Sequence, residues 1–234
     1  MNGLQLLKRT VINLLPDTIQ SFLMGMRTLA IEYGYLRSVR QKACVDKDGR
    51  PIPWYTYSSI EYLKQLDLSA KSVFEFGSGN STLFWSKEVG KIVSVEHDQG
   101  WYNRLSDQVS DNVEYRLCVE KAEYLDSITT FEPFDIIIID GVFREQCAQR
   151  AIDRLKPGGF IILDNADWWV DAARFLREKD LIQIDFYGPG PLVPYTWCTS
   201  LFFSRSFQWQ TKYVNQPTHG LGSLKQHAGE RFAL

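Results

Sequence analysis

The chain has 234 residues, enough for one domain with a sizeable core and too few for two full-sized domains. Its hydrophobic and charged fractions, 44% and 23%, are those of a globular protein and exclude a disordered or fibrous chain. The formal net charge of -2 gives no global basic footprint, so nothing in the composition favours nucleic acid as a partner.

The first 53 residues are predicted to form a helical extension followed by a linker. Apolar residues recur at helical spacing over residues 4–15 and again over residues 19–36. We interpret these patterns as two amphipathic helices that cap the domain or pack on a second subunit of a homo-oligomer. The alternative is peripheral attachment to a membrane surface through Lys8, Arg9 and the leucine face.

A polar stretch over residues 46–53, interrupted by glycine and proline, is typical of a linker. From Trp54 onward, short β-branched runs alternate with helical segments of ten or more residues. This alternation predicts repeated βαβ units and therefore a doubly wound α/β domain with a mainly parallel, seven-stranded sheet. We place the catalytic domain at residues 54–207 and a polar, weakly ordered tail at residues 208–234.

Seven strands and five helices are predicted within this domain. The strands span residues 72–76, 91–96, 113–117, 134–139, 159–164, 181–187 and 197–204, and the helices lie near residues 56–66, 80–88, 99–109, 143–155 and 167–178. The run Ile136–Ile139 is apolar on both faces, as expected of a central parallel strand. Residues 188–196 are too few for a helical crossover, so the last two strands should form an antiparallel hairpin at the sheet edge.

The first predicted strand ends in the turn Glu75-Phe-Gly-Ser-Gly-Asn-Ser81, which opens directly into a helix. Gly77 and Gly79 allow a backbone geometry and a close ligand approach that a Cβ atom would block. The helix that follows presents free N–H groups, Ser81 among its first residues, to a polar ligand. Taken alone, such a glycine pair is also compatible with an ordinary strand-to-helix turn.

The second predicted strand ends in Glu96, about 20 residues after the glycines, where doubly wound folds place an acid on ribose hydroxyls. Glu96 is therefore a candidate ribose ligand. His97 follows it directly and is a candidate for the adenosine pocket, although a lone histidine after a strand is more often a packing residue.

The turn distinguishes between two candidate cofactors, a nicotinamide dinucleotide and S-adenosylmethionine. A dinucleotide motif has a third glycine where this chain has Thr82, and the carboxylate of Glu75 would repel a pyrophosphate. A cofactor that carries a sulfonium and an ammonium group would instead be attracted to Glu75. Over residues 55–204 the chain resembles the class I S-adenosylmethionine-dependent methyltransferases, which have an acid and alternating glycines at the end of the first strand. The resemblance implies a Rossmann-like methyltransferase fold.

Two further strands end in polar residues, the fourth at Asp140 and the fifth at Asp164-Asn165. These residue types resemble the Mg²⁺ ligands of the catechol-type, cation-dependent O-methyltransferases, and oxygen ligands suit that ion. Those enzymes place a lysine base soon after the first aspartate, whereas this chain has Arg144. In the metal-free alternative, Asp140 itself accepts the substrate proton or orients the acceptor hydroxyl.

The acceptor is less well defined than the cofactor. The acid-rich strand ends and the catechol-type resemblance favour an oxygen of a small-molecule, sugar or lipid acceptor. The Asn-Pro-Pro-Tyr motif of base and amide N-methylation is absent after the fourth strand. Arg144 is expected to pair with an anionic acceptor or, slightly preferred, with a surface carboxylate such as Glu145. A non-catalytic nucleoside-binding or assembly subunit with the same fold is the alternative function.

Four widely separated cysteines, without a CxxC pair, predict buried free thiols and a reducing cytoplasm as the compartment. They are Cys44, Cys118, Cys147 and Cys198. No apolar stretch reaches the roughly 18 to 20 residues of a membrane span. His219 and His227 lie in the tail and are candidates for a base only if the tail folds back.

Overall fold

A seven-stranded sheet forms the centre of residues 15–223, the part of the chain that the computed structural model describes. The strands are β1 (Ser72–Phe76), β2 (Lys91–Glu96), β3 (Val113–Leu117), β4 (Phe134–Ile139), β5 (Leu155–Leu163), β6 (Ile182–Pro189) and β7 (Thr196–Phe203). They lie in the order β3-β2-β1-β4-β5-β7-β6. Strands β1 to β5 are parallel, and β7 lies antiparallel between β5 and β6. The predicted doubly wound sheet with its terminal antiparallel hairpin is confirmed.

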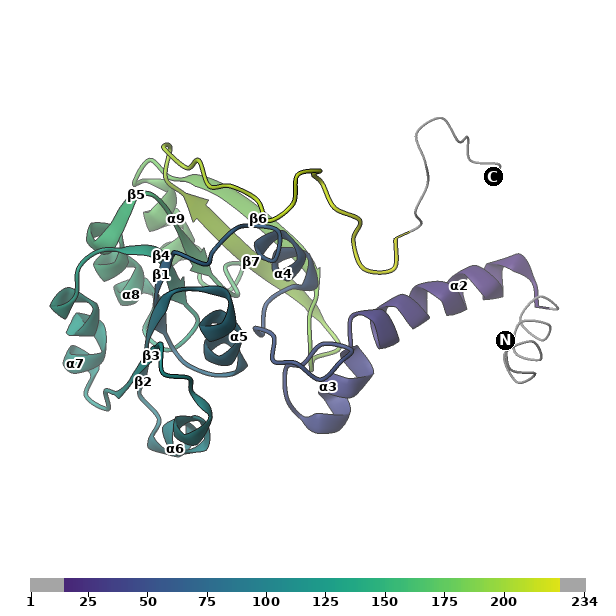
Figure 1. Cartoon of the computed structure of the whole chain (residues 1–234), viewed down its shortest axis with the longest axis horizontal. Helices are drawn as coiled ribbons and strands as arrows, with labels where there is room; N and C mark the ends of the chain where they lie inside the picture. Colours follow the sequence, from purple (N-terminus) through teal and green to yellow (C-terminus); the bar gives the residue numbers. More distant parts are fainter. Residues whose placement is uncertain (1–14, 224–234) are drawn as a thin grey trace.

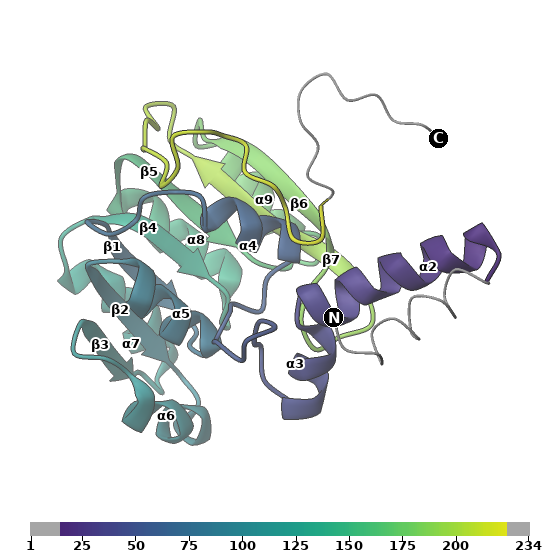
Figure 2. The ribbon, with the colours of Figure 1, turned by 45° about the vertical axis from the view of Figure 1, so that its right-hand side comes forward.

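Helices cover both faces of this sheet (Figures 1 and 2). On one face lie α4 (Tyr57–Leu63) and α5 (Asn80–Glu88), and on the other lie α7 (Lys121–Asp126), α8 (Arg144–Ala151) and α9 (Val170–Arg177). Helix α6 (Gln99–Leu105) packs beside β2. The predicted helices over residues 99–109 and 143–155 finish as 3₁₀ turns, Ser106–Gln108 and Ile152–Arg154. Helix α7, which the sequence pattern did not predict, continues into a third such turn, Ser127–Thr130.

Strand β4 shows why the sheet is buried on both faces. Ile136 and Ile138 pack into the core under α4 and α5, whereas Ile137 and Ile139 pack into the core under α7, α8 and α9. All four are fully buried. Successive side chains of a strand point to opposite faces, so a run of four isoleucines supplies both cores at once.

The N-terminal extension is helical but not continuous. It contains α2 (Asp17–Arg27), a π-helical turn (Thr28–Glu32) and α3 (Tyr35–Gln41). Gly34, at φ +78°, interrupts the single helix expected over residues 19–36, and a Cβ atom there would lie 2.4 Å from the carbonyl carbon of Asp46. Helix α2 has no buried residue and projects away from the sheet (Figure 1). The predicted helix over residues 4–15 lies outside the described residues.

The expected linker over residues 46–53 is an ordered turn. One carboxylate oxygen of Asp46 accepts hydrogen bonds from the backbone N–H groups of Asp48 and Arg50, both at 2.9 Å. Ile52 is only 2% exposed and belongs to the core under α4 and α5. The segment therefore joins the N-terminal extension to the domain without a break in packing.

Residues 208–223 lack helix and strand but fold back on the domain. Trp209 packs on Phe160, with ring centroids 5.0 Å apart, and Thr211 forms a β-bridge with Leu66. The four cysteines are buried free thiols, as predicted. Among the described residues, no helix is both long enough and apolar enough to cross a membrane.

Candidate active site

The glycine turn between β1 and α5 packs tightly against the turn that follows β4. Gly77 has a φ of +91°, and a Cβ atom there would lie 2.6 Å from the Cα atom of Gly141. Gly79 differs, because its Cβ atom would make only ordinary contacts, with the indole of Trp101 at 3.8 Å and the hydroxyl of Ser81 at 4.0 Å. Gly77 is therefore required by the fold, whereas Gly79 leaves its backbone open to an approaching ligand.

Glu75 lies behind this turn, fully buried, and does not line the cavity described below. Its carboxylate accepts hydrogen bonds from the hydroxyl groups of Thr82, at 2.6 Å, and Ser94, at 2.7 Å. Burial raises the pKa of Glu75 to about 7, and these hydrogen bonds oppose the shift. In this structure Glu75 stabilises the start of α5 through its hydrogen bond with Thr82. Its role beside the methionine end of the cofactor stays a prediction.

Glu96 joins the end of β2 to the glycine turn. One carboxylate oxygen accepts from the backbone N–H of Ser78 at 3.1 Å and from its hydroxyl at 2.7 Å. The other accepts from the backbone N–H groups of His97, at 2.9 Å, and Asp98, at 3.0 Å. The carboxylate is thus held in position mainly by backbone donors. Nδ1 of His97 lies 3.1 Å from this second oxygen, at an angle that makes no hydrogen bond.

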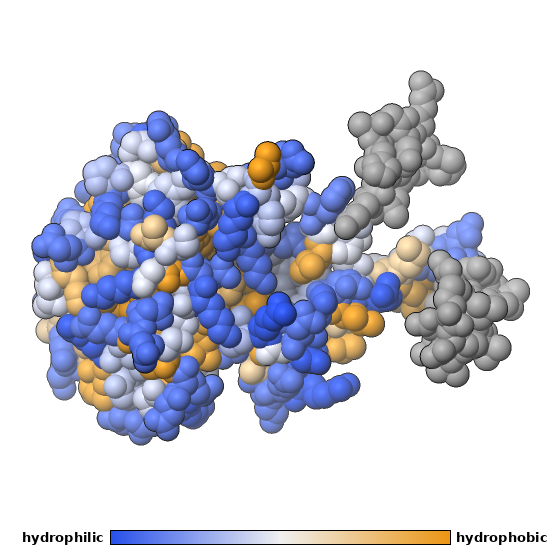
Figure 3. All heavy atoms as spheres, viewed as in Figure 1, coloured by the Kyte–Doolittle hydropathy of each residue, from blue (hydrophilic) through white to orange (hydrophobic). Residues whose placement is uncertain are grey.

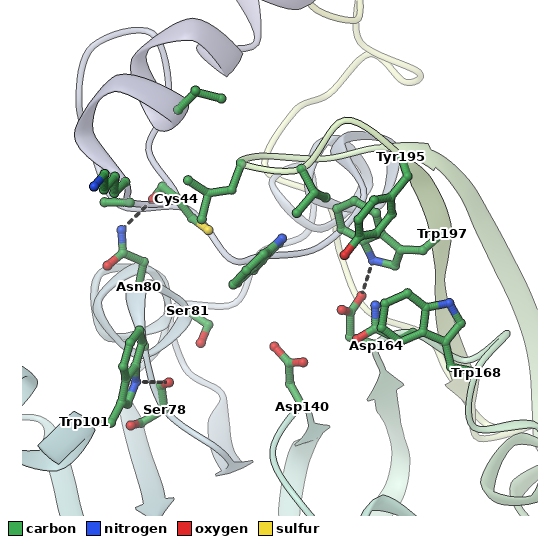
Figure 4. A pocket seen from close by; sticks show the side chains of 18 of the residues that line it. Cys44, Ser78, Asn80, Ser81, Trp101, Asp140, Asp164, Trp168, Tyr195 and Trp197 are labelled. Carbon is green, nitrogen blue, oxygen red and sulfur yellow. Dashed lines mark hydrogen bonds between the residues drawn. The ribbon is translucent and has the colours of Figure 1, made fainter. Parts of the chain in front are cut away.

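Trp101, in the first turn of α6, covers the glycine turn from the solvent side. Its indole N–H donates to the carbonyl of Ser78 at 2.7 Å, and its own backbone N–H donates to Asp98, the N-cap of the helix. The side chain is exposed, yet it lines the cavity (Figure 4). Trp101 was not among the predicted site residues. The sequence signal for it is an aspartate that can cap a helix, Asp98, followed three residues later by a tryptophan in the first turn, close to the end of β2.

Asp140 and Asp164 stand next to each other where β4 and β5 end, because Ile139 pairs with Leu163 in the parallel register. Arg144 joins the two strand ends. Its guanidinium donates to a carboxylate oxygen of Asp140 and to the side-chain oxygen of Asn165, both at 3.0 Å, and also to backbone carbonyls on both strand ends. Arg144 therefore pairs with Asp140 and not with the surface carboxylate that the sequence analysis preferred.

Both carboxyl groups titrate above their ordinary range. Burial raises the pKa of Asp140 to about 6, although the neighbouring guanidinium of Arg144 opposes the shift. Burial also raises the pKa of Asp164 well above its ordinary value, and the negative charge of Asp140 raises it further. One oxygen of Asp164 accepts from the indole of Trp197 at 3.0 Å and from the hydroxyl of Thr199. The site can hold a carboxylate and a carboxylic acid side by side.

This arrangement does not fit the expected Mg²⁺ site. The expected ligands were Asp140, Asp164 and Asn165, but the guanidinium of Arg144 already supplies a positive charge to Asp140 and Asn165. One oxygen of Asp164 is also used by two protein donors. Within residues 15–223, no group of three or more histidine, cysteine, aspartate or glutamate side chains is placed to hold a metal ion. Asp140 and Asn165 are therefore paired with the guanidinium of Arg144, which takes the place expected for Mg²⁺.

These side chains open into one cavity of about 670 Å³ at the carboxyl ends of the strands. Figure 4 shows Ser78, Asn80, Ser81 and Trp101 on one side of it, Asp140 and Asp164 on the floor, and Trp168, Tyr195 and Trp197 on the other side. The N-terminal extension closes part of the rim, since the side chain of Asn80 donates to the carbonyl of Cys44 at 2.6 Å.

The cavity brings together some of the predicted residues and not others. Those that line it are Gly79, Ser81, Asp140, Asp164 and Asn165. Four predicted residues lie in the turn or beside it and do not line the cavity: Glu75, Gly77, Glu96 and His97. His219 belongs to a separate cavity near α4, and His227 lies outside the described residues.

Comparison with known proteins yields one match in sequence and several in structure. A family model described as protein-L-isoaspartate(D-aspartate) O-methyltransferase matches residues 52–180, more than half of the chain. The match covers the glycine turn and both aspartates at the strand ends. No curated protein matches the sequence.

The similar solved structures share little sequence identity with this chain. The precorrin-6y C5,15-methyltransferase of Geobacter metallireducens GS-15 is 14% identical over 70% of this chain and 92% of that chain, with a TM-score of 0.48. The spermidine synthase of Thermotoga maritima is 21% identical over 59% and 54%, with a TM-score of 0.48. The N-methyltransferase NodS of Bradyrhizobium japonicum WM9, in complex with S-adenosyl-L-homocysteine, is 13% identical over 58% and 79%, with a TM-score of 0.43.

Proposed function

We propose that this chain, which belongs to the protein-L-isoaspartate(D-aspartate) O-methyltransferase family and is an S-adenosylmethionine-dependent methyltransferase, methylates an oxygen of a small-molecule, sugar or lipid acceptor. The observation that carries the proposal is Asp140, a partly buried carboxyl group that faces the cavity beside the glycine turn. A hydroxyl acceptor must lose its proton during transfer, and Asp140 is placed to receive it. The family description also names methylation at oxygen.

The cavity suits the cofactor in size and in charge. Its volume of about 670 Å³ lies within the roughly 300 to 1,000 Å³ of small-molecule sites. The carboxylate of Asp140 gives the floor a negative charge that favours a sulfonium. Gly79 lets the cofactor approach the first turn of α5, and we expect the ribose hydroxyls at the carboxylate of Glu96.

When bound, S-adenosylmethionine supplies an electrophilic methyl group on its sulfonium. The chain contributes positioning and proton removal. Asp140 accepts the proton of the attacking hydroxyl, and Arg144 holds that carboxylate toward the cavity through a hydrogen bond of 3.0 Å. The side chains of Trp168 and Tyr195 line the acceptor side, opposite the glycine turn.

The decisive experiment is the substitution Asp140→Asn, which keeps the shape of the side chain and removes the base. We expect kcat for methyl transfer to fall about 10² to 10⁴-fold, while the affinity for S-adenosylmethionine, measured by calorimetry, changes little. The matched control is Asp171→Asn on the exposed surface of α9, which should leave both quantities unchanged.

The wild-type chain separates the proposal from its alternatives in the same assay. Binding of S-adenosylmethionine without transfer to any acceptor would favour the non-catalytic subunit. An Asp140→Asn variant that retains full kcat would show that another group accepts the proton.

A further inference from the structure

The acceptor side of the cavity is formed by large aromatic side chains that remain partly open to solvent. Trp54, Trp168 and Tyr195 all line the cavity and are 44%, 58% and 48% exposed. The rings of Trp168 and Tyr195 lie 6.1 Å apart and are tilted by 39° (Figure 4). Exposed aromatic surface gathered at the mouth of a cavity marks a binding surface, because water solvates these rings poorly.

The floor beneath these rings is rich in hydrogen-bond acceptors. Asp140, Asp164 and Asn165 occupy the adjacent ends of β4 and β5. Neighbouring strands lie about 4.8 Å apart, so the polar side chains at these two strand ends can contact hydroxyl groups on more than one carbon of a ring. Asp140 and Asp164 each use one carboxylate oxygen for protein donors, which leaves the second oxygen of each to contact a ligand hydroxyl.

The charge of the floor argues against an anionic acceptor. The guanidinium of Arg144 is already used by Asp140, Asn165 and backbone carbonyls, and its side chain is only 11% exposed. Lys42, the other cation among the described lining residues, is exposed on the rim after α3. A carboxylate or phosphate that approached the floor would meet the negative charge of Asp140 without a free cation to receive it.

We propose that the acceptor is a neutral carbohydrate, free or as the head of a glycoside. Its ring face packs on Trp168 and Tyr195, since the C–H groups of a sugar ring carry partial positive charge and the faces of aromatic rings are negative. Its hydroxyl groups donate to the acceptors of the floor. This inference rests on the proposed function and names the acceptor class for the same site.

The transfer balances with the groups in the site. A sugar hydroxyl oxygen forms a bond to the methyl carbon, the bond between that carbon and sulfur breaks, and its electron pair stays on sulfur. The hydroxyl proton moves to the carboxylate of Asp140. The products are a methyl ether of the sugar and S-adenosylhomocysteine.

The test uses the full chain, S-adenosylmethionine and methyl glycosides of hexoses and deoxyhexoses. Each hexoside is paired with its uronic acid counterpart, which differs by a carboxylate, and catechol and an L-isoaspartyl peptide complete the panel. Mass spectrometry identifies the methylated product. We expect transfer to a neutral glycoside, with kcat/KM at least tenfold lower for the matched uronate.

Substitutions in the aromatic wall test the mode of binding. Trp168→Ala and Tyr195→Ala should each raise KM for the glycoside about tenfold, with kcat changed less than about twofold and with unchanged affinity for S-adenosylmethionine. Trp168→Phe and Tyr195→Phe keep a ring and should retain most of the affinity. Both side chains are about half exposed, so these variants are expected to fold.

The outcomes separate this inference from the proposed function. Transfer to catechol or to the isoaspartyl peptide, with none to any glycoside, overturns the carbohydrate assignment and leaves oxygen methylation intact. Uronates that react as well as their hexosides overturn the charge argument. A folded chain that binds no S-adenosylmethionine overturns the proposed function itself.

Discussion

Arg144 influences the protonation state of Asp140, the residue that is proposed to accept the proton. Its guanidinium lies 3.0 Å from the carboxylate of Asp140 and opposes the effect of burial, which raises the pKa of that group to about 6. Only the ionised carboxylate can accept a proton, so activity should depend on this ion pair.

We expect kcat/KM to rise with pH through about 6 and then to level off. In Arg144→Gln the carboxylate loses its cation, so the pKa of Asp140 rises and the rising limb moves to higher pH. Arg144→Lys, which keeps the charge but cannot span the two strand ends, should move the limb less. The measurement is the pH dependence of kcat/KM for the three proteins.

Chelation distinguishes a site built on the Arg144 guanidinium from a site built on a metal ion. A strong chelator should leave wild-type activity unchanged, because Arg144 and not a divalent cation contacts Asp140 and Asn165. Loss of activity on chelation, restored by Mg²⁺, would contradict this assignment.

The buried carboxyl group of Glu75 predicts a second pH dependence, that of the free energy of unfolding. Its pKa is about 7 in the folded chain and 4.5 without burial, so the folded state binds the proton more tightly. Stability therefore falls as pH rises from about 4.5 to about 7. Glu75→Gln removes this loss, and its free energy of unfolding relative to wild type should increase by about 3 kcal/mol across that range. Denaturant unfolding at pH 4.5 and 8 measures the difference.

The control for this prediction is Glu123→Gln on the exposed face of α7, where no such trend is expected. A Glu75→Gln variant whose relative stability is the same at both pH values would show that the buried carboxyl is not protonated preferentially in the folded chain.

At the scale of elements, Gly77 and Gly79 of the turn between β1 and α5 have different roles. Gly77→Ala places a Cβ atom 2.6 Å from Gly141 at a φ of +91°, so we expect about 3 kcal/mol of destabilisation. In Gly79→Ala the new Cβ atom makes ordinary contacts with Trp101, at 3.8 Å, and Ser81, at 4.0 Å, so the variant should fold normally. It should nevertheless weaken binding of S-adenosylmethionine at least tenfold, because the added methyl group occupies the ligand's approach.

Thermal unfolding and calorimetry of the two alanine variants check this contrast. Gly25→Ala in α2, where a Cβ atom meets nothing within 4 Å, is a control for the loss of a glycine. Equal cofactor affinity in Gly79→Ala and wild type would place the ligand away from this turn.

Elements with a strong local pattern could be predicted from the sequence. β4 is recognisable because four isoleucines fill both cores, and the β6 to β7 hairpin because its connection is too short for a helix. Helix α7 was missed because it is only six residues long, with too few apolar positions to define a period. The break at Gly34 was missed because it depends on a contact with Asp46, twelve residues away in the sequence.

The site was predictable in its residue types and not in its contacts. The acids at the ends of β2, β4 and β5 follow from the position of ligands in open α/β sheets. That Glu75 is buried against Thr82 and does not line the cavity, and that Arg144 bonds to both Asp140 and Asn165, depends on side-chain packing between elements. The sequence does not show which side chains contact one another. The Mg²⁺ site was expected because the residue types at the strand ends suit that ion, and the pairing of Asp140 and Asn165 with Arg144 could not be foreseen.

At the scale of the whole molecule, α2 projects from the domain with an apolar stripe facing solvent. Ile19, Phe22, Leu23 and Met26 recur at helical spacing and are 42% to 65% exposed. Figure 3 shows apolar side chains on the surface of this projecting segment. Such a stripe is typical of a surface that contacts a second subunit or a membrane, and both remain proposals, as does the cytoplasmic location.

Replacing two residues of the stripe, Phe22→Ser with Met26→Ser, tests this surface. We expect the free energy of unfolding to change by less than about 1 kcal/mol, because α2 has no buried residue. Self-association in sedimentation experiments, or co-sedimentation with anionic vesicles, should decrease. A large loss of stability without any change in association would indicate that α2 packs on its own domain in solution.

Four of the seven tryptophans line the cavity at the strand ends: Trp54, Trp101, Trp168 and Trp197. Trp101 reports on the glycine turn through its hydrogen bond to Ser78, and Trp168 stands on the opposite wall. A ligand that enters either half therefore changes the polarity around a different indole. The intrinsic fluorescence of the unlabelled chain should consequently respond to cofactor and to acceptor, and Trp101→Phe should weaken the first response and Trp168→Phe the second.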